Sequence, residues 1–182
     1  VLDHSGTAKM VSGIGKDVIG SIFSPMDGDV NSLRLLRALH DGMIKLGADY
    51  QPHHVVTSVE PLSSGFMLRG AWGEVFTERL ILSAGVGTSS LAAMVDIDAP
   101  TVRSKGQILV TEKCAPFFPY TSATVRQTDE GGIMIGDSQE TNTDRISTNQ
   151  NISTVLADRA IRTFPFLANV NVVRSWAGFR VK

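Results

Sequence analysis

Two residues before its last, the chain contains an arginine whose setting suits the binding of a carboxylate. Arg180 stands in the run Ser175–Lys182, in which aromatic and small residues surround a glycine, and the apolar stretch Val170–Val173 precedes this run. The pattern predicts a strand that holds the guanidinium at a defined place. A planar guanidinium can donate two parallel hydrogen bonds to a carboxylate. The alternative is a solvated charge at a frayed terminus, and this segment alone does not decide between the two.

A second candidate site is a turn made of small residues. Leu80–Leu82 is continuously apolar, as in a strand buried on both faces, and it leads directly into Ser83–Thr88, which contains two glycines. Such a turn lets the backbone come close to a flat or phosphorylated ligand. An ordinary strand-to-helix turn is the alternative, and the motif taken alone favours it. The full dinucleotide fingerprint is absent because Ser90 stands where its third glycine would be.

The remaining reactive side chains form no recognisable catalytic or metal-binding pattern. His53 and His54 are adjacent, so on a strand they would point to opposite faces and could not share a metal ion. Cys114 is the only cysteine, which excludes an internal disulfide and favours a reducing compartment. No nucleophile motif surrounds it. We therefore expect surface histidines, a thiol without a catalytic role and no metal site.

Composition narrows the class of protein and its partners. The 182 residues are 42% hydrophobic, enough for a real core, and suit one domain or one large part of a bigger enzyme. Seventeen Lys and Arg against eighteen Asp and Glu give a net charge of -1, which argues against nucleic acid as a partner. The longest uncharged stretch, Leu80–Val95, is too short and too broken by small residues to span a bilayer. We expect a cytoplasmic protein, with peripheral attachment at the inner membrane as the alternative.

Two helices and a series of antiparallel strands must position these residues. From Asn31 to Gly47 the apolar residues recur at three- and four-residue steps, which predicts an amphipathic helix that Gly47 ends. A second helix is predicted over 152–163, with Ile152, Val155, Leu156 and Ile161 as its core face. Strands are predicted at 18–23, 55–59, 66–69, 75–77, 80–82, 107–111, 122–126 and 133–135, several of them joined as hairpins. We expect an α+β fold, with a mixed, mostly antiparallel sheet and helices packed on one side.

Seven segments, taken together, carry a family likeness. They are Asp27–Asn31 with the helix that follows, Lys45–Ala48, Val55–Val59, Leu80–Gly85, Lys105–Gln107, Gly132–Gly136 and Trp176–Arg180. In this order and spacing they resemble the D-amino-acid-oxidase-like family of FAD-dependent oxidoreductases. This family includes glycine oxidase, sarcosine oxidase and the catalytic subunits of opine oxidase and hydrogen cyanide synthase. The likeness covers nearly the whole chain.

The resemblance implies a role for individual residues. Val56 matches the position whose backbone amide and carbonyl face the adenine of FAD, and Ala84 and Gly85 match the turn beside the ribose and phosphates. Gly106 and Gln107 match the strand that enters beside the flavin. Arg180 matches the arginine that binds the substrate carboxylate. Ser122 lies on a strand that carries substrate-facing side chains, at a position where an aromatic residue is expected.

The resemblance also implies a domain organisation. Residues 1–100 would be the middle part of the FAD-binding domain, with the helix at 31–47, the hairpins at 55–77 and the strand at 80–85. Residues 101–182 would be the substrate-binding sheet with the helix at 152–163. The strand, Gly-rich turn and helix that seat the FAD pyrophosphate in this family are not found in the sequence. We therefore expect a central fragment of a longer flavoenzyme, inactive by itself and without bound FAD.

The implied activity is oxidation of the CH–NH bond of an amino acid or a secondary amine. The substrate would be a small amino acid or amine, and the protein would be a homo- or hetero-oligomer. Two departures from the family pattern leave another class open. Gly87 replaces a tryptophan that commonly follows the Ala-Gly turn, and Ser122 replaces an aromatic residue. The alternative is a non-catalytic subunit or interaction module that retains the fold.

Overall fold

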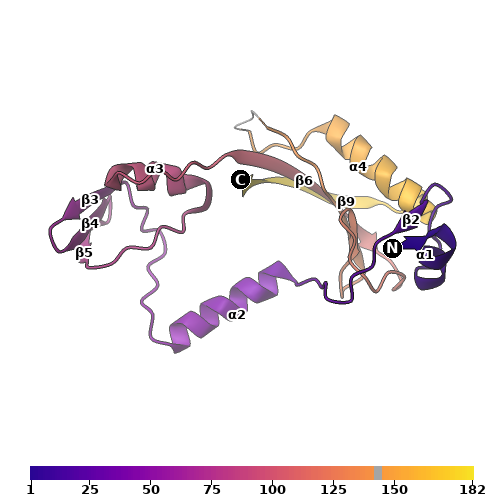
Figure 1. Ribbon diagram of the computed structural model, residues 1–182, viewed down its shortest axis with the longest axis horizontal. Helices are drawn as coiled ribbons and strands as arrows, with labels where there is room; N and C mark the ends of the chain where they lie inside the picture. The colour runs from indigo at the N-terminus through magenta and orange to yellow at the C-terminus, as the bar shows by residue number, and fades with distance from the viewer. Residues whose placement is uncertain (142–144) are drawn as a thin grey trace. The chain divides into compact units, whose positions relative to one another are not determined.

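The computed structural model describes residues 1–141 and 145–182 (Figure 1). The chain divides into two compact units, one formed by Val1–Asn31 with Lys105–Phe179 and the other by Ser32–Ser104 with Arg180–Lys182. These bounds differ from the 1–100 and 101–182 of the sequence prediction, because the first 31 residues join the later segment. The assignment of a cofactor role to 1–100 and a substrate role to 101–182 stays a prediction.

The first unit is organised around a sheet with the strand order β7-β8-β6-β9. Its strands are β6 (Arg103–Lys113), β7 (Val125–Gln127), β8 (Gly132–Ile135) and β9 (Val172–Val181). β8 pairs antiparallel with both β6 and β7, and Arg126 opposite Met134 fixes the register of the β7–β8 hairpin. This confirms the predicted hairpin. The predicted strand at 122–126 begins later, at Val125, because Ser122 and Val125 close a turn on each other.

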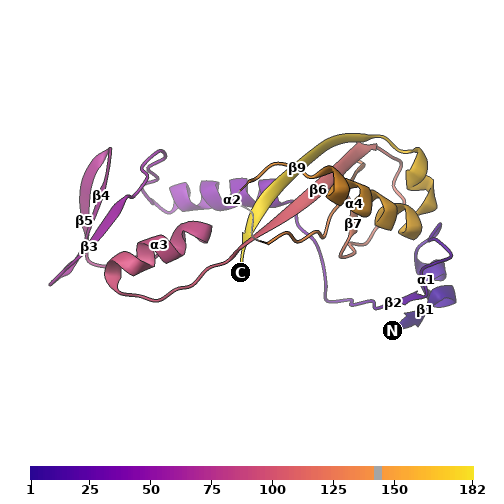
Figure 2. The ribbon, with the colours of Figure 1, turned by 90° about the horizontal axis from the view of Figure 1, so that it is seen from above.

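The helix α4 (Gln150–Thr163) lies alongside β6 and β9 in both ribbon views (Figures 1 and 2). Asn149 caps it, since its side-chain oxygen accepts a hydrogen bond from the amide of Asn151 at 3.0 Å. A short 3₁₀ helix, η3 (Pro165–Asn169), follows. The predicted helix at 152–163 is therefore confirmed.

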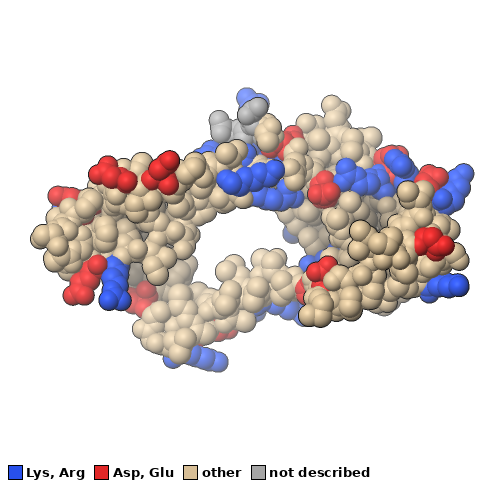
Figure 3. Space-filling model, viewed as in Figure 1, with Lys and Arg blue, Asp and Glu red and all other residues tan. Residues whose placement is uncertain are grey.

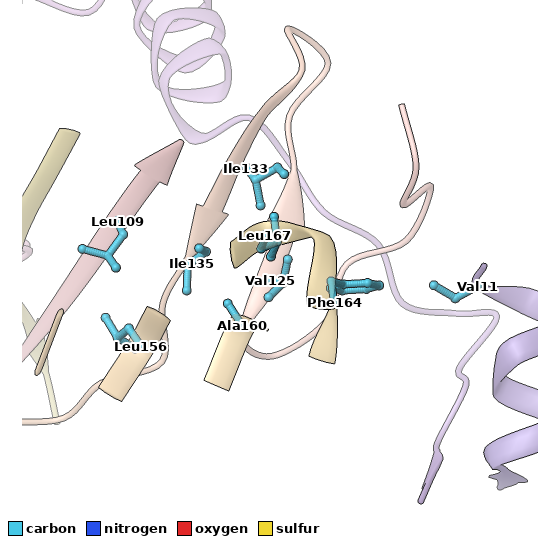
Figure 4. Close-up of a cluster of buried hydrophobic side chains, with 9 residues drawn as sticks. All are labelled: Val11, Leu109, Val125, Ile133, Ile135, Leu156, Ala160, Phe164 and Leu167. Carbon is cyan, nitrogen blue, oxygen red and sulfur yellow. The ribbon is translucent and has the colours of Figure 1, made fainter. Parts of the chain in front are cut away.

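The core of the first unit lies between this helix and the sheet (Figure 4). Its members are Val11, Leu109, Val125, Ile133, Ile135, Leu156, Ala160, Phe164 and Leu167. The predicted core position Val155 is wrong, because it is 52% exposed. The buried stripe follows a four-residue step from Ile152 through Leu156 to Ala160, and Val155 lies beside that stripe.

The N-terminal segment contains elements that the sequence did not predict. β1 (Leu2–Asp3) pairs antiparallel with β2 (Gly20–Ser21), and α1 (His4–Met10) lies between them in the sequence. Asp3 caps α1 by accepting a hydrogen bond from the Gly6 amide at 2.7 Å. The predicted strand at 18–23 shortens to β2, since only these two residues find a partner strand.

The second unit contains an antiparallel sheet with the order β3-β4-β5. Its strands are β3 (Ser58–Leu62), β4 (Gly65–Gly70) and β5 (Gly73–Thr77), which confirms the predicted run of hairpins. Arg69 forms ion pairs with Glu60 and with Glu74 on the neighbouring strands. The hydrogen bonds from these carboxylates, with that of Glu60 the larger cause, raise the pKa of Arg69 above its ordinary value.

The helix α2 (Ser32–Lys45) forms where the sequence predicted it, but it buries none of its side chains. Leu33, Leu36 and Leu39 are 77%, 64% and 62% exposed. Gly47 has a φ of 82°, the left-handed conformation that commonly ends a helix. The face of α2 seen in Figure 3 is largely free of charged side chains, whereas charges of both signs are interspersed over other elements.

The predicted buried strand at 80–82 is wrong for this structure. No residue from Leu80 to Ala84 is in a strand, and Ile81 is 87% exposed. An apolar run forms a strand only where a neighbouring strand accepts its backbone hydrogen bonds, and none of the described strands pairs with it. The chain continues into η1 (Gly85–Gly87), α3 (Thr88–Ala92) and η2 (Ala93–Val95).

Two kinds of feature are missing from the part of the chain that the structure describes. None of the helices in those residues is long and apolar enough to cross a membrane. The same residues contain no group of three His, Cys, Asp or Glu side chains arranged to hold a metal ion.

Candidate functional site

The second unit contains both the end of β9, with Arg180, and the Ala84–Gly85 turn. Arg180 lies in β9, as predicted, and its neighbour Val181 approaches the turn. A Cβ atom built on Gly85 would lie 3.8 Å from Cγ2 of Val181. The end of the strand is fixed, because Val102 and Lys182 exchange backbone hydrogen bonds of 2.7 and 2.9 Å. The guanidinium therefore belongs to a hydrogen-bonded strand, and its side chain is exposed.

The Ala84–Gly85 turn presents its backbone to solvent. Both residues are exposed, and Gly85 has a φ of 58°, a conformation that residues with a side chain rarely adopt. A Cβ atom on Gly87 would meet only the Cβ of Ala84, at 3.7 Å. The following helix α3 is linked to the segment before β6, since Ser89 Oγ accepts a hydrogen bond from the Thr101 amide at 3.0 Å. The turn is thus exposed, and the helix that follows it is anchored.

Val56 lies in an extended segment just before β3, between two anchored neighbours. The carbonyl of Val55 accepts a hydrogen bond from Nε1 of Trp72 at 2.9 Å, and the amide of Thr57 donates to the carbonyl of Arg69 at 2.8 Å. Val56 is half-buried. Among the residues that the structure describes, its own amide and carbonyl form no hydrogen bond. One backbone donor and one backbone acceptor are therefore available side by side.

Gly106 and Gln107 lie in the first unit, and both are buried. The side chain of Gln107 connects β6 to the start of α4. Its Oε1 accepts a hydrogen bond from the Asn149 amide at 2.7 Å, and its Nε2 donates to Ser153 Oγ at 2.5 Å and to the Asn149 carbonyl at 3.3 Å. Its backbone amide donates to Ser138 Oγ at 2.8 Å. Gln107 thus has a structural role in this unit, and its predicted flavin contact stays a prediction.

Ser122 also uses its hydroxyl within the protein. The Oγ atom donates to the carbonyl of Val125 and accepts from the amide of Val125, both at 2.9 Å, and so closes the turn before β7. Ser122 lines a cleft of about 570 Å³ together with Phe23, Asp29 and Tyr120. Its predicted contact with substrate stays a prediction.

Sequence reasoning missed this cleft and the ion pair near it. Phe23 and Tyr120 meet edge to face with their ring centroids 5.6 Å apart. Arg126 forms an ion pair with Asp29 and donates to the carbonyl of Val30 at 2.9 Å, which ties the 27–31 loop to β7. The aromatic run at 117–120 was the available signal, but nothing in the sequence pairs Arg126 with a residue 97 positions earlier.

The family of the chain is decided by a match along its whole length. The family model described as "FAD dependent oxidoreductase" (DAO) matches residues 1–182. The chain belongs to this family. The resemblance expected from the seven sequence segments is therefore confirmed.

The chain is similar to curated proteins along nearly its whole length. The chain is 54% identical to a subunit of opine oxidase from Agrobacterium tumefaciens (strain Ach5), over 100% of this chain and 49% of that protein. It is 29% identical to hydrogen cyanide synthase subunit HcnC of Pseudomonas protegens, over 98% of this chain and 45% of that protein. The chain thus spans about half the length of the curated relatives it matches.

Solved structures of the same fold agree with the predicted α+β class. The crystal structure of glycine oxidase from Geobacillus kaustophilus matches with a TM-score of 0.92 at 21% identity, covering 100% of this chain and 50% of that chain. L-proline dehydrogenase from P. horikoshii matches with a TM-score of 0.88 at 17% identity, covering 98% of this chain and 51% of that chain. The mixed helices and antiparallel sheets of the DAO fold are therefore confirmed.

The residues of this DAO-family chain fit part of an FAD molecule. Within the described part of the chain, the unpaired amide and carbonyl of Val56 match the donor and acceptor that neighbour each other on an adenine edge. The exposed Ala84–Gly85 backbone suits a ribose or phosphate that must approach closely. The sequence contains no G-x-G-x-x-G motif for the pyrophosphate. The fit is therefore to the adenosine half of the cofactor.

Proposed function

We propose that this chain is the central part of a longer flavoenzyme that oxidises the CH–NH bond of an amino acid or a secondary amine. The observation that carries the proposal is that Arg180 and the exposed Ala84–Gly85 turn belong to one unit, in which Val181, the residue after Arg180, lies at the turn. The same unit then contains a cation that can bind a carboxylate and a backbone turn that suits a nucleotide. The relatives named as opine oxidase and glycine oxidase support this reaction class.

Each residue of the proposed site has a limited and definite task. Val56 would bind the adenine through its backbone, and Ala84 and Gly85 would accommodate the ribose and phosphates. Arg180 would bind the substrate carboxylate and so orient the carbon that is oxidised. FAD, when bound, would supply the hydride acceptor, and water would hydrolyse the substrate imine that results. No acid or base from this chain is needed for that step.

Kinetics of an arginine variant test the carboxylate role. In the full-length flavoenzyme, Arg180→Ala should raise the KM for an amino acid by roughly 10- to 100-fold, because a hydrogen bond to a charged group contributes about 1.5–3 kcal/mol. The KM for the matching amine without a carboxylate should stay within about twofold, as expected when no binding group is lost. Arg174→Ala, an exposed arginine earlier on β9, is the control. Equal effects on both substrates would remove the carboxylate role.

A flavin titration tests whether the rest of the protein is required. The 182-residue chain alone should bind FAD weakly, because the pyrophosphate motif is not in its sequence. If the chain alone instead bound a yellow flavin tightly, and amino acids reduced that flavin, further segments would not be essential for FAD binding.

A non-catalytic subunit that retains the DAO fold is the second candidate. It is favoured by the side chains of Gln107 and Ser122, which are both committed to hydrogen bonds inside the first unit. The relatives named as subunits also suit a homo- or hetero-oligomer. An intact Gly-rich nucleotide motif in the full-length sequence would argue against this candidate. We place the protein in the cytoplasm, with peripheral attachment at the inner membrane as the alternative.

A further inference from the structure

We infer that Trp72 is a positioning residue for the cofactor: its indole holds the Val55–Val56 peptide in the conformation that binds adenine. The inference rests on the proposed function and adds to it a side chain that does not touch the ligand. Trp72 lies in the turn between β4 and β5, seventeen residues after the carbonyl that it binds. The indole N–H of a partly buried tryptophan commonly takes one fixed acceptor, and here that acceptor is Val55.

The approach of the indole depends on a glycine. A Cβ atom built on Gly70 would lie 2.2 Å from Nε1 of Trp72 and 2.3 Å from the carbonyl oxygen of Val55. Both distances are far below van der Waals contact, so any larger residue at position 70 would separate donor from acceptor. The indole at the end of the hairpin can therefore reach the Val55 carbonyl because residue 70 has no side chain.

The segment before Val56 is packed onto the same indole. The imidazole of His54 lies over Trp72 with ring centroids 4.9 Å apart and planes inclined by 39°. Its Nδ1 forms a hydrogen bond of 2.9 Å with the carbonyl of Pro52. His53 has a φ of 64°, which is uncommon for a residue other than glycine. This loop is thus held by the ring contact with Trp72 and by a hydrogen bond within the loop.

These contacts fix the backbone on both sides of Val56. The bond from Trp72 fixes the residue before it, and the Thr57 amide bonded to the Arg69 carbonyl fixes the residue after it. Both anchors belong to the β4–β5 hairpin. Because β3 is an edge strand of its sheet, the outer side of this segment has no neighbouring strand among the described residues. The hairpin therefore presents the Val56 amide and carbonyl in one orientation, ready for an adenine edge.

The test is FAD binding by the full-length protein, measured as flavin fluorescence quenching of the apoprotein. Trp72→Phe keeps an aromatic ring under His54 but removes the N–H donor. It should raise the Kd for FAD by roughly 3- to 10-fold, as expected from one hydrogen bond that orders a binding segment. His54→Ala, which removes an exposed ring, should raise the Kd by about 2- to 5-fold, consistent with an aromatic pair. Trp176→Phe, at an exposed position on β9, is the control and should leave the Kd unchanged.

Hydrogen exchange supplies a readout that does not depend on activity. In the wild-type protein, FAD should slow exchange at the Val56 amide, and Trp72→Phe should reduce this protection. Equal FAD affinity for Trp72→Phe and Trp176→Phe, or a Val56 amide that FAD does not protect, would overturn the inference. If Trp72→Phe does not fold, the same two criteria apply to His54→Ala. A wild-type protein that does not bind FAD at all would instead refute the proposed function, so the two failures are distinguishable.

Discussion

The two compact units differ in how they bury their apolar residues. The first unit contains the whole hydrophobic cluster, from Val11 to Leu167, and five of its side chains are at most 2% exposed, those of Val125, Ile133, Leu156, Ala160 and Phe164. In the second unit, Val59 and Ala92 are the hydrophobic residues that reach comparable burial among the described residues. The first unit therefore has a core of its own, whereas the second consists of hairpins and helices with little core.

The helices α2 and α4 illustrate this difference in burial. α2 and α4 both span 14 residues and are both amphipathic, but α4 buries Leu156 and Ala160 whereas α2 buries nothing. Amphipathic spacing predicts that a helix has one apolar face, and it does not identify the surface that covers this face. If the chain is part of a longer flavoenzyme, as proposed, the apolar side of α2 and the unpaired 80–82 segment are the places where further polypeptide would pack.

The largest expected effect is in the core of the first unit. Leu156→Ala should destabilise the protein by about 2–5 kcal/mol, because it removes buried methyl groups and leaves a cavity. Val155→Ala, at a neighbouring position that is 52% exposed, should change stability by at most about 0.5 kcal/mol. Urea unfolding followed by circular dichroism measures both. Similar midpoints for the two variants would show that the first unit lacks the core described.

A smaller effect is expected at the polar connection between β6 and α4. Gln107→Leu should cost about 1–3 kcal/mol, since the Asn149 amide and the Ser153 hydroxyl would lose their buried partner. Gln150→Leu, at an exposed position on the same helix, is the control and should be nearly neutral. A neutral Gln107→Leu variant would mean that these hydrogen bonds contribute little to stability.

The sequence predicted individual helices and strands better than it predicted which elements pair or pack with one another. The β3–β4–β5 hairpins and both long helices follow from turn residues and spacing that act over a few residues. The 80–82 segment was predicted as a buried strand from its apolar composition, but a strand also needs a neighbour that composition does not reveal. α1 was missed because its sequence, His4–Met10, has no apolar periodicity and depends on the Asp3 cap.

The candidate site was predictable only where the family resemblance named a residue. Arg180, Ala84 and Gly85 all belong to the second unit, although they are far apart in sequence, and their roles stay predictions. The hydrogen bond from Trp72 to Val55 could not be predicted, because it depends on how the hairpin folds back over the preceding loop. For the same reason, sequence alone did not show that Gln107 and Ser122 use their side chains internally.

The smallest effect in the 182-residue chain is expected on the apolar face of α2. Leu36→Ala should change its unfolding free energy by at most about 0.5 kcal/mol, because Leu36 is already 64% exposed and alanine is a good helix former. In the full-length flavoenzyme the same substitution should cost about 2–5 kcal/mol, as for a buried leucine. Arg37→Ala, on the adjacent position, should be nearly neutral in both proteins. A full-length protein as insensitive as the chain would mean that α2 stays uncovered, and that the contrast between the two units is intrinsic to them.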